Sequence, residues 1–389
     1  KALLLDNEYD WEDDSLPKLS YGESVVYGMH VRGFTMHASS GVKAKGTFAG
    51  VIEKIPYLRD LGITTVELQP IYEFNERPKI SEEGMDKMIK SIPDKVNYWG
   101  YQDAFYYAPK RAYAFKEDSI TECKDMIKAF HKNNMEVVMQ VYFKQDTPIS
   151  EVVSILRYWH IVYHVDGFHL IGDMPQIKEV ARDAFLSDCK LWYHQFPVGE
   201  LYAAHEKPEY RNLATYNDGY MYDMRRFLKG DEGMLYEVMK HMRINPATNG
   251  VINYITNYYG FTMADLVSFD RKYNEANGED NKDGVDYNFS WNCGVEGSTR
   301  KKQVLALREK QIRNAFTLLM LSQGTPFFYM GDEFGNSQKG NNNPYCQDND
   351  ITWLNWKDLN KNKEMHSFVK ELIAFRKNNG VFHLPKECM

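Results

Sequence analysis

Short runs of apolar, β-branched residues alternate with amphipathic helical stretches along almost the whole chain, and this alternation limits its fold most strongly. Strands are expected at 25–30, 65–68, 136–142, 167–171, 190–193, 251–256 and 326–330. Helices are expected at 48–61, 120–133, 149–164, 176–186, 303–321 and 365–377. Such a rhythm predicts parallel βα units, and 389 residues suffice for one α/β (β/α)8 TIM barrel. Functional side chains of such barrels lie at the carboxyl ends of the strands.

The domain organisation that we expect has three parts. Residues 1–20 form a lead-in segment, residues 21–380 form the barrel, and residues 381–389 form a tail or the start of a further β-domain. We find no short internal repeat and no low-complexity linker in the sequence.

Composition excludes some classes of function. The net charge is −7 and lysine and arginine do not cluster, so a nucleic-acid partner is not expected. Aromatic residues make up 14%, which fits a sugar-binding cleft because rings pack on pyranose C–H faces. Five scattered cysteines favour a reducing compartment, and we predict a cytoplasmic protein. No apolar run is long enough to span a membrane, and no cofactor is expected.

Several long segments resemble the glycogen-debranching, isoamylase- and pullulanase-like branch of the alpha-amylase superfamily (glycoside hydrolase family 13). They are HVRGFT at 30–35, GTFAGVIEKIPYLRDLGITTVELQPIYEF at 46–74, NYWGYQ at 97–102 and the segments 260–297 and 324–356. Matches of this length are far more specific than a short motif. The resemblance implies a glycosidase barrel, here without the family's N-terminal and C-terminal β-domains and with a reduced loop region after the third barrel strand.

The resemblance also implies where catalytic groups would lie. Retaining cleavage of a glucosidic bond needs two carboxyl groups about 5 Å apart. Segment 165–171 reads VDGFHLI where the family shows VDGFRFD, so the nucleophile position holds Ile171. By the same register the third-strand carboxylate, the arginine, the acid/base and the seventh-strand His-Asp pair are replaced by Gln140, His169, His194, Tyr258 and Tyr259. We therefore expect no catalytic residues at the family's positions.

A retained activity would need relocated acids. Glu200, in a GEL context, becomes the acid/base if the register slips by six residues, and Asp173 lies two residues beyond Ile171. A shift of two residues should remove Asp173 from productive geometry. An active hydrolase that uses Asp173 and Glu200 therefore stays the alternative, and a structural barrel without sugar affinity stays a second alternative.

The resemblance implies a set of substrate-binding candidates: Tyr98, Trp99, Tyr101, Asn342, Asn343 and Tyr345. Each also has an ordinary structural interpretation, since aromatic rings pack in barrels and Asn and Pro set turns. No metal site is expected, because His169 and His194 have no third ligand at supporting spacing. The leading hypothesis is a non-catalytic homologue that binds α-glucan or acts as a regulatory partner of an active debranching enzyme.

Overall fold

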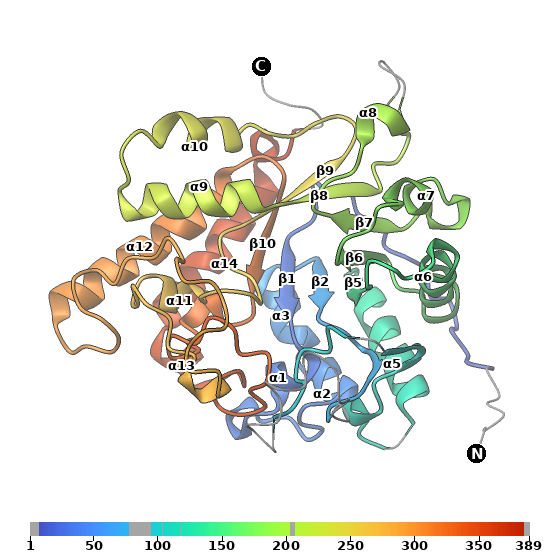
Figure 1. The fold of residues 1–389 in the computed structure, drawn as a ribbon, viewed down its shortest axis with the longest axis horizontal. Helices are drawn as coiled ribbons and strands as arrows, with labels where there is room; N and C mark the ends of the chain where they lie inside the picture. The colour runs from blue at the N-terminus through green and yellow to red at the C-terminus, as the bar shows by residue number, and fades with distance from the viewer. Residues whose placement is uncertain (1–7, 78–94, 103, 117, 203–206, 385–389) are drawn as a thin grey trace.

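A closed barrel of parallel strands forms the centre of the computed structural model, which describes residues 8–77, 95–102, 104–116, 118–202 and 207–384 (Figure 1). The strands follow one another around the barrel in the order β1-β10-β9-β8-β7-β6-β5-β2. Their bounds are β1 Val26–Met29, β2 Thr65–Leu68, β5 Glu136–Tyr142, β6 Gly167–Ile171, β7 Lys190–Tyr193, β8 Leu213–Asn217, β9 Gly250–Tyr254 and β10 Thr325–Tyr329. The predicted (β/α)8 architecture is confirmed.

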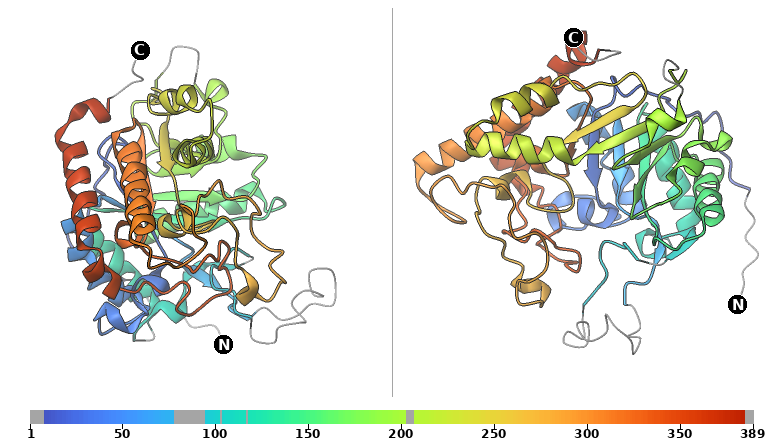
Figure 2. Two further views of the ribbon diagram at one scale, coloured as in Figure 1. Left: turned by 90° about the vertical axis from the view of Figure 1, so that its left-hand side faces the viewer. Right: turned by 45° about the horizontal axis from the view of Figure 1, so that its top comes forward.

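Helices surround the barrel, and α12 and α14 lie side by side against it (Figure 2). The bounds are α1 Val31–Thr35, α2 Phe48–Ile52, α3 Ile55–Leu61, α5 Ser119–His131, α6 Ile149–Tyr163, α7 Ile177–Ala181, α8 Val198–Leu201, α9 Asp218–Lys229, α10 Leu235–His241, α11 Met263–Leu266, α12 Lys302–Leu321, α13 Lys357–Lys361 and α14 Lys363–Asn378. The long predicted helices 120–133, 149–164, 303–321 and 365–377 are confirmed.

Two predicted helices are interrupted, and one strand was not predicted. The predicted helix 48–61 is divided into α2 and α3, because Pro56 in the first turn of α3 has no N–H to continue the ladder. The predicted helix 176–186 is α7 followed by a 3-10 turn at Ala184–Leu186. Strand β8, LATYN, escaped prediction because its short sequence has no continuous apolar run.

The barrel interior is filled by large side chains from alternating strand positions. Val26, Val138, Trp192 and Phe327 form one buried cluster with residues of β8 and β9. Gly28 makes room for this cluster, since a Cβ there would lie 2.3 Å from the ring of Phe327. The barrel centre is therefore a packed core rather than a pore.

The connections at the carboxyl ends of two neighbouring strands are short. Residues 143–148 join β5 to α6, and residues 172–176 join β6 to α7. The additional antiparallel pair β3 Tyr72–Phe74 and β4 Ala104–Pro109 lies between β2 and α5 instead. The reduced loop region that was predicted after the third barrel strand, β5, is thus confirmed.

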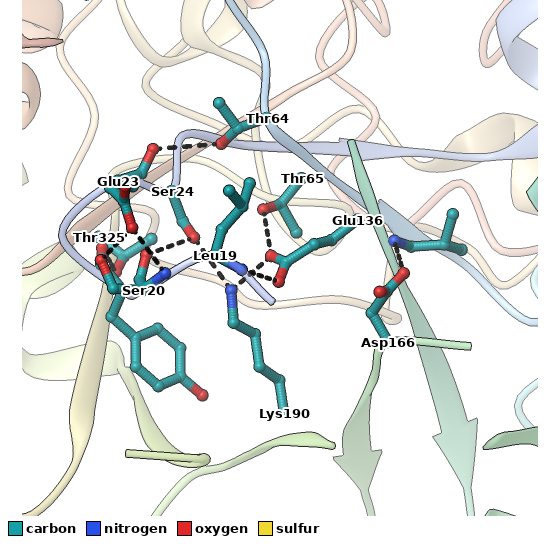
Figure 3. Close-up of polar contacts among 12 residues, drawn as sticks. Leu19, Ser20, Glu23, Ser24, Thr64, Thr65, Glu136, Asp166, Lys190 and Thr325 are labelled. Carbon is teal, nitrogen blue, oxygen red and sulfur yellow. Dashed lines mark hydrogen bonds and ion pairs between the residues drawn. The ribbon is translucent and has the colours of Figure 1, made fainter. Parts of the chain in front are cut away.

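A buried polar network closes the amino-terminal end of the barrel (Figure 3). Lys190, at the start of β7, donates to the Glu136 carboxylate of β5 and, over 3.1 Å, to Ser24. Glu136 also accepts from the Thr65 hydroxyl at 3.0 Å and from the backbone N–H of Leu19 at 2.9 Å. Both charged side chains are 1% exposed, so the pair is shielded from water and each charge depends on its partner.

The lead-in segment is held against the outside of the barrel by charged and aromatic contacts. Asp14 accepts from His131 at 2.9 Å and from His164 at 2.7 Å, and Trp11 stacks on His164 at 3.7 Å. His131 also lies 2.9 Å from the Asp166 carboxylate. Although burial opposes it, these two carboxylates raise the pKa of His131 above its usual value.

The described part of the chain contains no helix that is both long and apolar enough to cross a membrane. Cys123, Cys189, Cys293 and Cys346 are free thiols. Cys388, together with the rest of the predicted tail beyond residue 384, lies outside the described residues.

Candidate functional site

A cleft of about 300 Å³ opens at the carboxyl ends of strands β6 to β9. It is the place where the fold leads one to expect functional side chains. The cleft is lined by His169, Leu170, Ile171, Gly172, His194, Tyr216, Asp218, Met221, Tyr222, Tyr254, Asn257, Tyr258 and Tyr259.

Five of the six positions singled out from the sequence meet in this cleft: His169, Ile171, His194, Tyr258 and Tyr259. The sixth, Gln140, pairs with His169 in the β5–β6 register and is buried at 1% exposure. Its side-chain oxygen accepts from the hydroxyl of Tyr101. The structure therefore brings together residues from three separate strands whose alignment was inferred from sequence alone.

Glu67 is a functional candidate that sequence reasoning missed. It lies on β2, is 1% exposed, and its carboxylate accepts from His169 Nδ1 at 2.5 Å. The available signal was a charged residue inside an otherwise apolar strand, Thr65–Leu68, since a buried acid needs a partner. The pair joins the floor of the cleft to β2, which lies two strands from β6 around the barrel.

Asp218 is the second residue that was missed, and it is the carboxylic acid among the residues that line the cleft. It begins α9 directly after β8, and its carboxylate accepts from the hydroxyl of Tyr254. Because β8 was not predicted, its carboxyl end could not be searched for acids. The cleft lining therefore offers one carboxyl group, already hydrogen-bonded to a tyrosine.

Tyrosine rings occupy much of the remaining cleft wall. Tyr216 stacks on His169 with ring centroids 4.2 Å apart, and Tyr254 packs on Tyr216 at 4.6 Å. Tyr258 lies 5.6 Å from Trp99 and 5.3 Å from Tyr101 between ring centroids. Burial, and to a lesser extent Glu67, raises the pKa of Tyr258, which keeps its hydroxyl protonated. These tyrosines make this part of the wall aromatic.

The aromatic substrate-binding candidates lie behind this wall. Tyr98 is 4% exposed and stacks on His30 at 4.0 Å, while Trp99 is 7% exposed. Tyr101 is half-buried and touches the cleft through Tyr258. None of Tyr98, Trp99 and Tyr101 is among the residues that line the cleft. Trp99 and Tyr101 pack against the lining residue Tyr258, whereas Tyr98 packs on His30.

The loop candidates form a separate amide network. Asn342 is fully buried and donates to the Val285 carbonyl at 2.8 Å, and Asn343 donates to Asp283 at 2.9 Å. Tyr345 donates its hydroxyl to Glu279. These contacts fix the loop conformation, and none of the three residues lines the cleft.

The two relocated acids of the alternative hypothesis lie outside the cleft. Glu200 forms an exposed ion pair with Lys178, and its side chain is 63% exposed. Asp173 lines a different hollow of about 240 Å³ between residues 143–152 and 173–176. The structure thus does not bring Asp173 and Glu200 together with the cleft residues.

Within the described ranges, one group of side chains has metal-ligating spacing, and it lies on α9 and α10 rather than in the cleft. It comprises Asp223, Glu237 and His241, with His241 Nε2 2.9 Å from the Asp223 carboxylate. His169 and His194 do not belong to it.

Comparison with known proteins places this geometry in context. Residues 26–146 match the alpha-amylase catalytic domain. The chain is 33% identical to the chloroplastic Isoamylase 3 of Oryza sativa subsp. japonica, an alignment that covers 96% of this chain and 57% of the rice protein. It is 32% identical to the Glycogen operon protein GlgX homolog of Haemophilus influenzae, covering 98% of this chain and 67% of that protein.

The alignment lengths bear on the shortened connections. The alignment to the rice isoamylase runs over 459 positions whereas this chain has 389 residues. The rice protein therefore carries residues inside the matched span that have no counterpart here. The chain spans little more than half the length of most of these curated relatives.

Solved structures agree on the fold. The apo pullulanase from Paenibacillus barengoltzii superposes with a TM-score of 0.73 at 22% identity, over 99% of this chain and 67% of that chain. A D470A mutant of that pullulanase, solved as a complex with maltotetraose, superposes with a TM-score of 0.72 at 22% identity, over 97% and 66% of the two chains.

Proposed function

Because the chain belongs to the alpha-amylase family, in the branch of the isoamylases, GlgX proteins and pullulanases, we propose that it binds α-glucan without hydrolysing it. The proposed ligand class is that of the α-1,6-branched glucans, glycogen and starch, and their oligosaccharides. The maltotetraose in the related pullulanase supports this class of ligand.

The observation that carries the proposal is the lack of an acid pair in the cleft lining. Retaining hydrolysis needs a carboxylate nucleophile and a second carboxyl group about 5 Å away. Among the described residues that line the cleft, Asp218 is the only carboxylic acid, and it is bonded to Tyr254. Glu67 lies below the lining and is bonded to His169. Ile171 stands at the end of β6, where the family resemblance places the nucleophile, and its side chain has no group that can attack an anomeric carbon.

The short connections support loss of catalysis independently. Long loops after barrel strands exclude water and grip the substrate in glycosidases of this type. Here residues 143–148 and 172–176 are the whole connections after β5 and β6, so one side of the cleft has low walls. A cleft of this shape suits binding of a chain that extends beyond it.

We further propose that the protein acts as a regulatory or targeting partner of an active debranching enzyme. A glucan-binding barrel without its own acid pair would localise that enzyme on a branched polymer. The alternative of an active hydrolase gains no support from Asp173 and Glu200, because neither reaches the cleft.

The test is reducing-sugar release from pullulan, glycogen and maltodextrin at high protein concentration, together with the thermal midpoint in the presence of maltoheptaose. We expect no release above background and a raised midpoint, since a ligand that binds the folded state stabilises it. The variants Asp173→Asn, Glu200→Gln and Asp218→Asn serve as controls. Release that any of them abolishes would overturn the proposal, and an unchanged midpoint would favour a structural barrel.

A further inference from the structure

The Glu67–His169 pair is buried, borders the cleft and has no catalytic role in the proposed function. We infer that it is the polar recognition element of the cleft floor. In this inference His169 Nε2 forms a hydrogen bond with a hydroxyl group of the bound sugar. Glu67 is a positioning residue that acts through the imidazole. The inference rests on the proposed function and deepens it.

The hydrogen on the imidazole is fixed by Glu67. His169 Nδ1 lies 2.5 Å from the Glu67 carboxylate, and the two side chains are 6% and 1% exposed. In this inference the Glu67 carboxylate is the acceptor, so Nδ1 carries the hydrogen that bridges the pair. The remaining ring nitrogen, Nε2, is therefore the one available to a ligand.

His169 Nε2 has no hydrogen-bond partner in the described part of the chain, although the residue lines the cleft. Nε2 is not fully enclosed by protein atoms, so it borders open space. Glu67 orients the imidazole ring, and Nε2 faces the cleft without a hydrogen-bond partner. A polar atom held in this way is typical of a ligand contact.

The ring is held in one orientation by its neighbours. Tyr216 stacks on it at 4.2 Å with an interplanar angle of 25°, and Trp192 lies 6.4 Å away on the next strand. His194 differs, because it is exposed and its ring contacts Tyr193 at 3.9 Å. His169 is thus preorganised in a way that His194 is not, which reduces the entropy lost on binding.

Charge decides between a sugar hydroxyl and an anion as the ligand group. The Glu67 carboxylate lies behind His169, and the Asp218 carboxylate lies on the same cleft wall. Negative charge from these two acids disfavours a phosphate or carboxylate ligand. A hydroxyl is uncharged, and it donates to a neutral imidazole or accepts from a protonated one. An uncharged polyol is therefore the class of ligand that fits this floor.

The first test needs no substitution. Side-chain ¹⁵N spectra of histidine-labelled protein are recorded during titration with maltoheptaose. We expect the Nε2 resonance of His169 to shift on saturation while that of Nδ1 moves less. A bound complex in which the His169 resonances do not move would overturn the inference.

The second test compares an aromatic position in the cleft with one outside it, by calorimetric titration with maltoheptaose. His169→Phe keeps the stack on Tyr216 but removes Nε2, and we expect at least a tenfold loss of affinity. Tyr236→Phe is the matched control, because Tyr236 lies on α10, is 73% exposed and does not line the cleft. We expect that control to bind within twofold of the wild type.

Glu67 is tested through the tautomer that it sets. Glu67→Gln retains an acceptor for Nδ1 and should preserve both the tautomer and the affinity within threefold. Glu67→Leu should lose the tautomer preference in the ¹⁵N spectrum together with affinity. If the wild-type protein binds glucan and the His169→Phe variant binds it equally well, the inference alone is refuted. If the wild-type protein binds no glucan, the proposed function is refuted and the inference with it.

Discussion

The two ends of the same barrel are built in opposite ways. At the amino-terminal end, Glu136 and Lys190 are fully buried and every charge has a partner (Figure 3). At the carboxyl-terminal end, the cleft lining holds tyrosines, two histidines and the single acid Asp218. One end concentrates paired charge where no ligand can reach it, and the other has little charge where a glycosidase would need it most.

This difference separates the requirements of folding from those of chemistry. Side chains at the amino-terminal end of such barrels serve stability, whereas those at the carboxyl end serve function. Under the proposed function, a barrel of this family keeps its architecture although the groups for hydrolysis are replaced.

The largest effect is expected from breaking the network at the amino-terminal end. Lys190→Met leaves the Glu136 carboxylate buried without its partner, which should cost about 3–5 kcal/mol of unfolding free energy. Urea unfolding measures this loss, and affinity of the folded variant for maltoheptaose should stay unchanged.

The double variant Glu136→Gln/Lys190→Met is the control for that prediction. It removes both charges and keeps an acceptor for the backbone N–H of Leu19, so it should recover part of the loss. A single variant that costs less than about 1 kcal/mol would mean that the two ends of the barrel do not differ as we describe.

A pH-dependent effect is expected from Glu333, which follows β10. Its Oε1 accepts from Tyr27 and Tyr57, its Oε2 is enclosed without a partner, and burial raises its pKa from 4.5 to about 7. Between these pH values the folded state binds more protons than the unfolded state, so stability falls as the pH rises. The Glu333 contribution to this fall is roughly 3 kcal/mol.

Chemical unfolding at pH 4.5 and pH 8 tests this prediction. Glu333→Gln resembles the protonated acid and should flatten the pH dependence relative to wild type. Burial also raises the pKa values of Asp265 and Asp332 to about 6, so the variant retains a smaller fall from those two acids. Equal slopes in the two proteins would show that Glu333 is ionised in the fold.

A smaller effect is expected from the acid in the cleft. Asp218→Asn removes a charge that is exposed and bonded to Tyr254, so thermal or urea unfolding should change by about 1 kcal/mol. Glucan affinity should change little, because His169 rather than Asp218 is assigned the central contact. A loss of unfolding free energy as large as that of Lys190→Met would contradict the difference between the two ends of the barrel.

The smallest effect is expected at the exposed pair of Glu200 and Lys178. Glu200→Gln should alter the unfolding free energy by less than about 0.5 kcal/mol, because surface ion pairs are screened by water. It should also leave glucan affinity unchanged. A clear drop in glucan affinity would show that Glu200 is part of the binding surface.

Much of the fold was predictable from sequence, for reasons visible in particular elements. The bounds of β2, β5, β6 and β7 coincide with the predicted ones because buried parallel strands are rich in apolar residues. β8 was missed since LATYN mixes polar residues into a short strand. The division between α2 and α3 depends on Pro56, a signal that was present but outweighed by the apolar periodicity.

The site was predictable only in part. The resemblance located His169, Ile171, His194, Tyr258 and Tyr259, which do meet in the cleft. Glu67 could not be linked to His169 from sequence, because 102 residues separate them and the contact exists only once the barrel closes. Asp218 was hidden with the unpredicted strand that positions it. The contacts of Glu67 with His169 and of Asp218 with Tyr254 form only when the barrel closes, so a local sequence pattern does not predict them.

The most direct test of the central claim is intact-mass spectrometry after incubation with a fluorinated α-maltosyl fluoride. Such reagents leave a glycosyl group covalently attached to a retaining glycosidase, because the fluorine slows hydrolysis of the intermediate. We predict that the mass of the protein does not change, since the proposed function assigns no carboxylate nucleophile to the cleft. A stoichiometric glycosyl adduct, mapped to any carboxylate in or near the cleft, would contradict it.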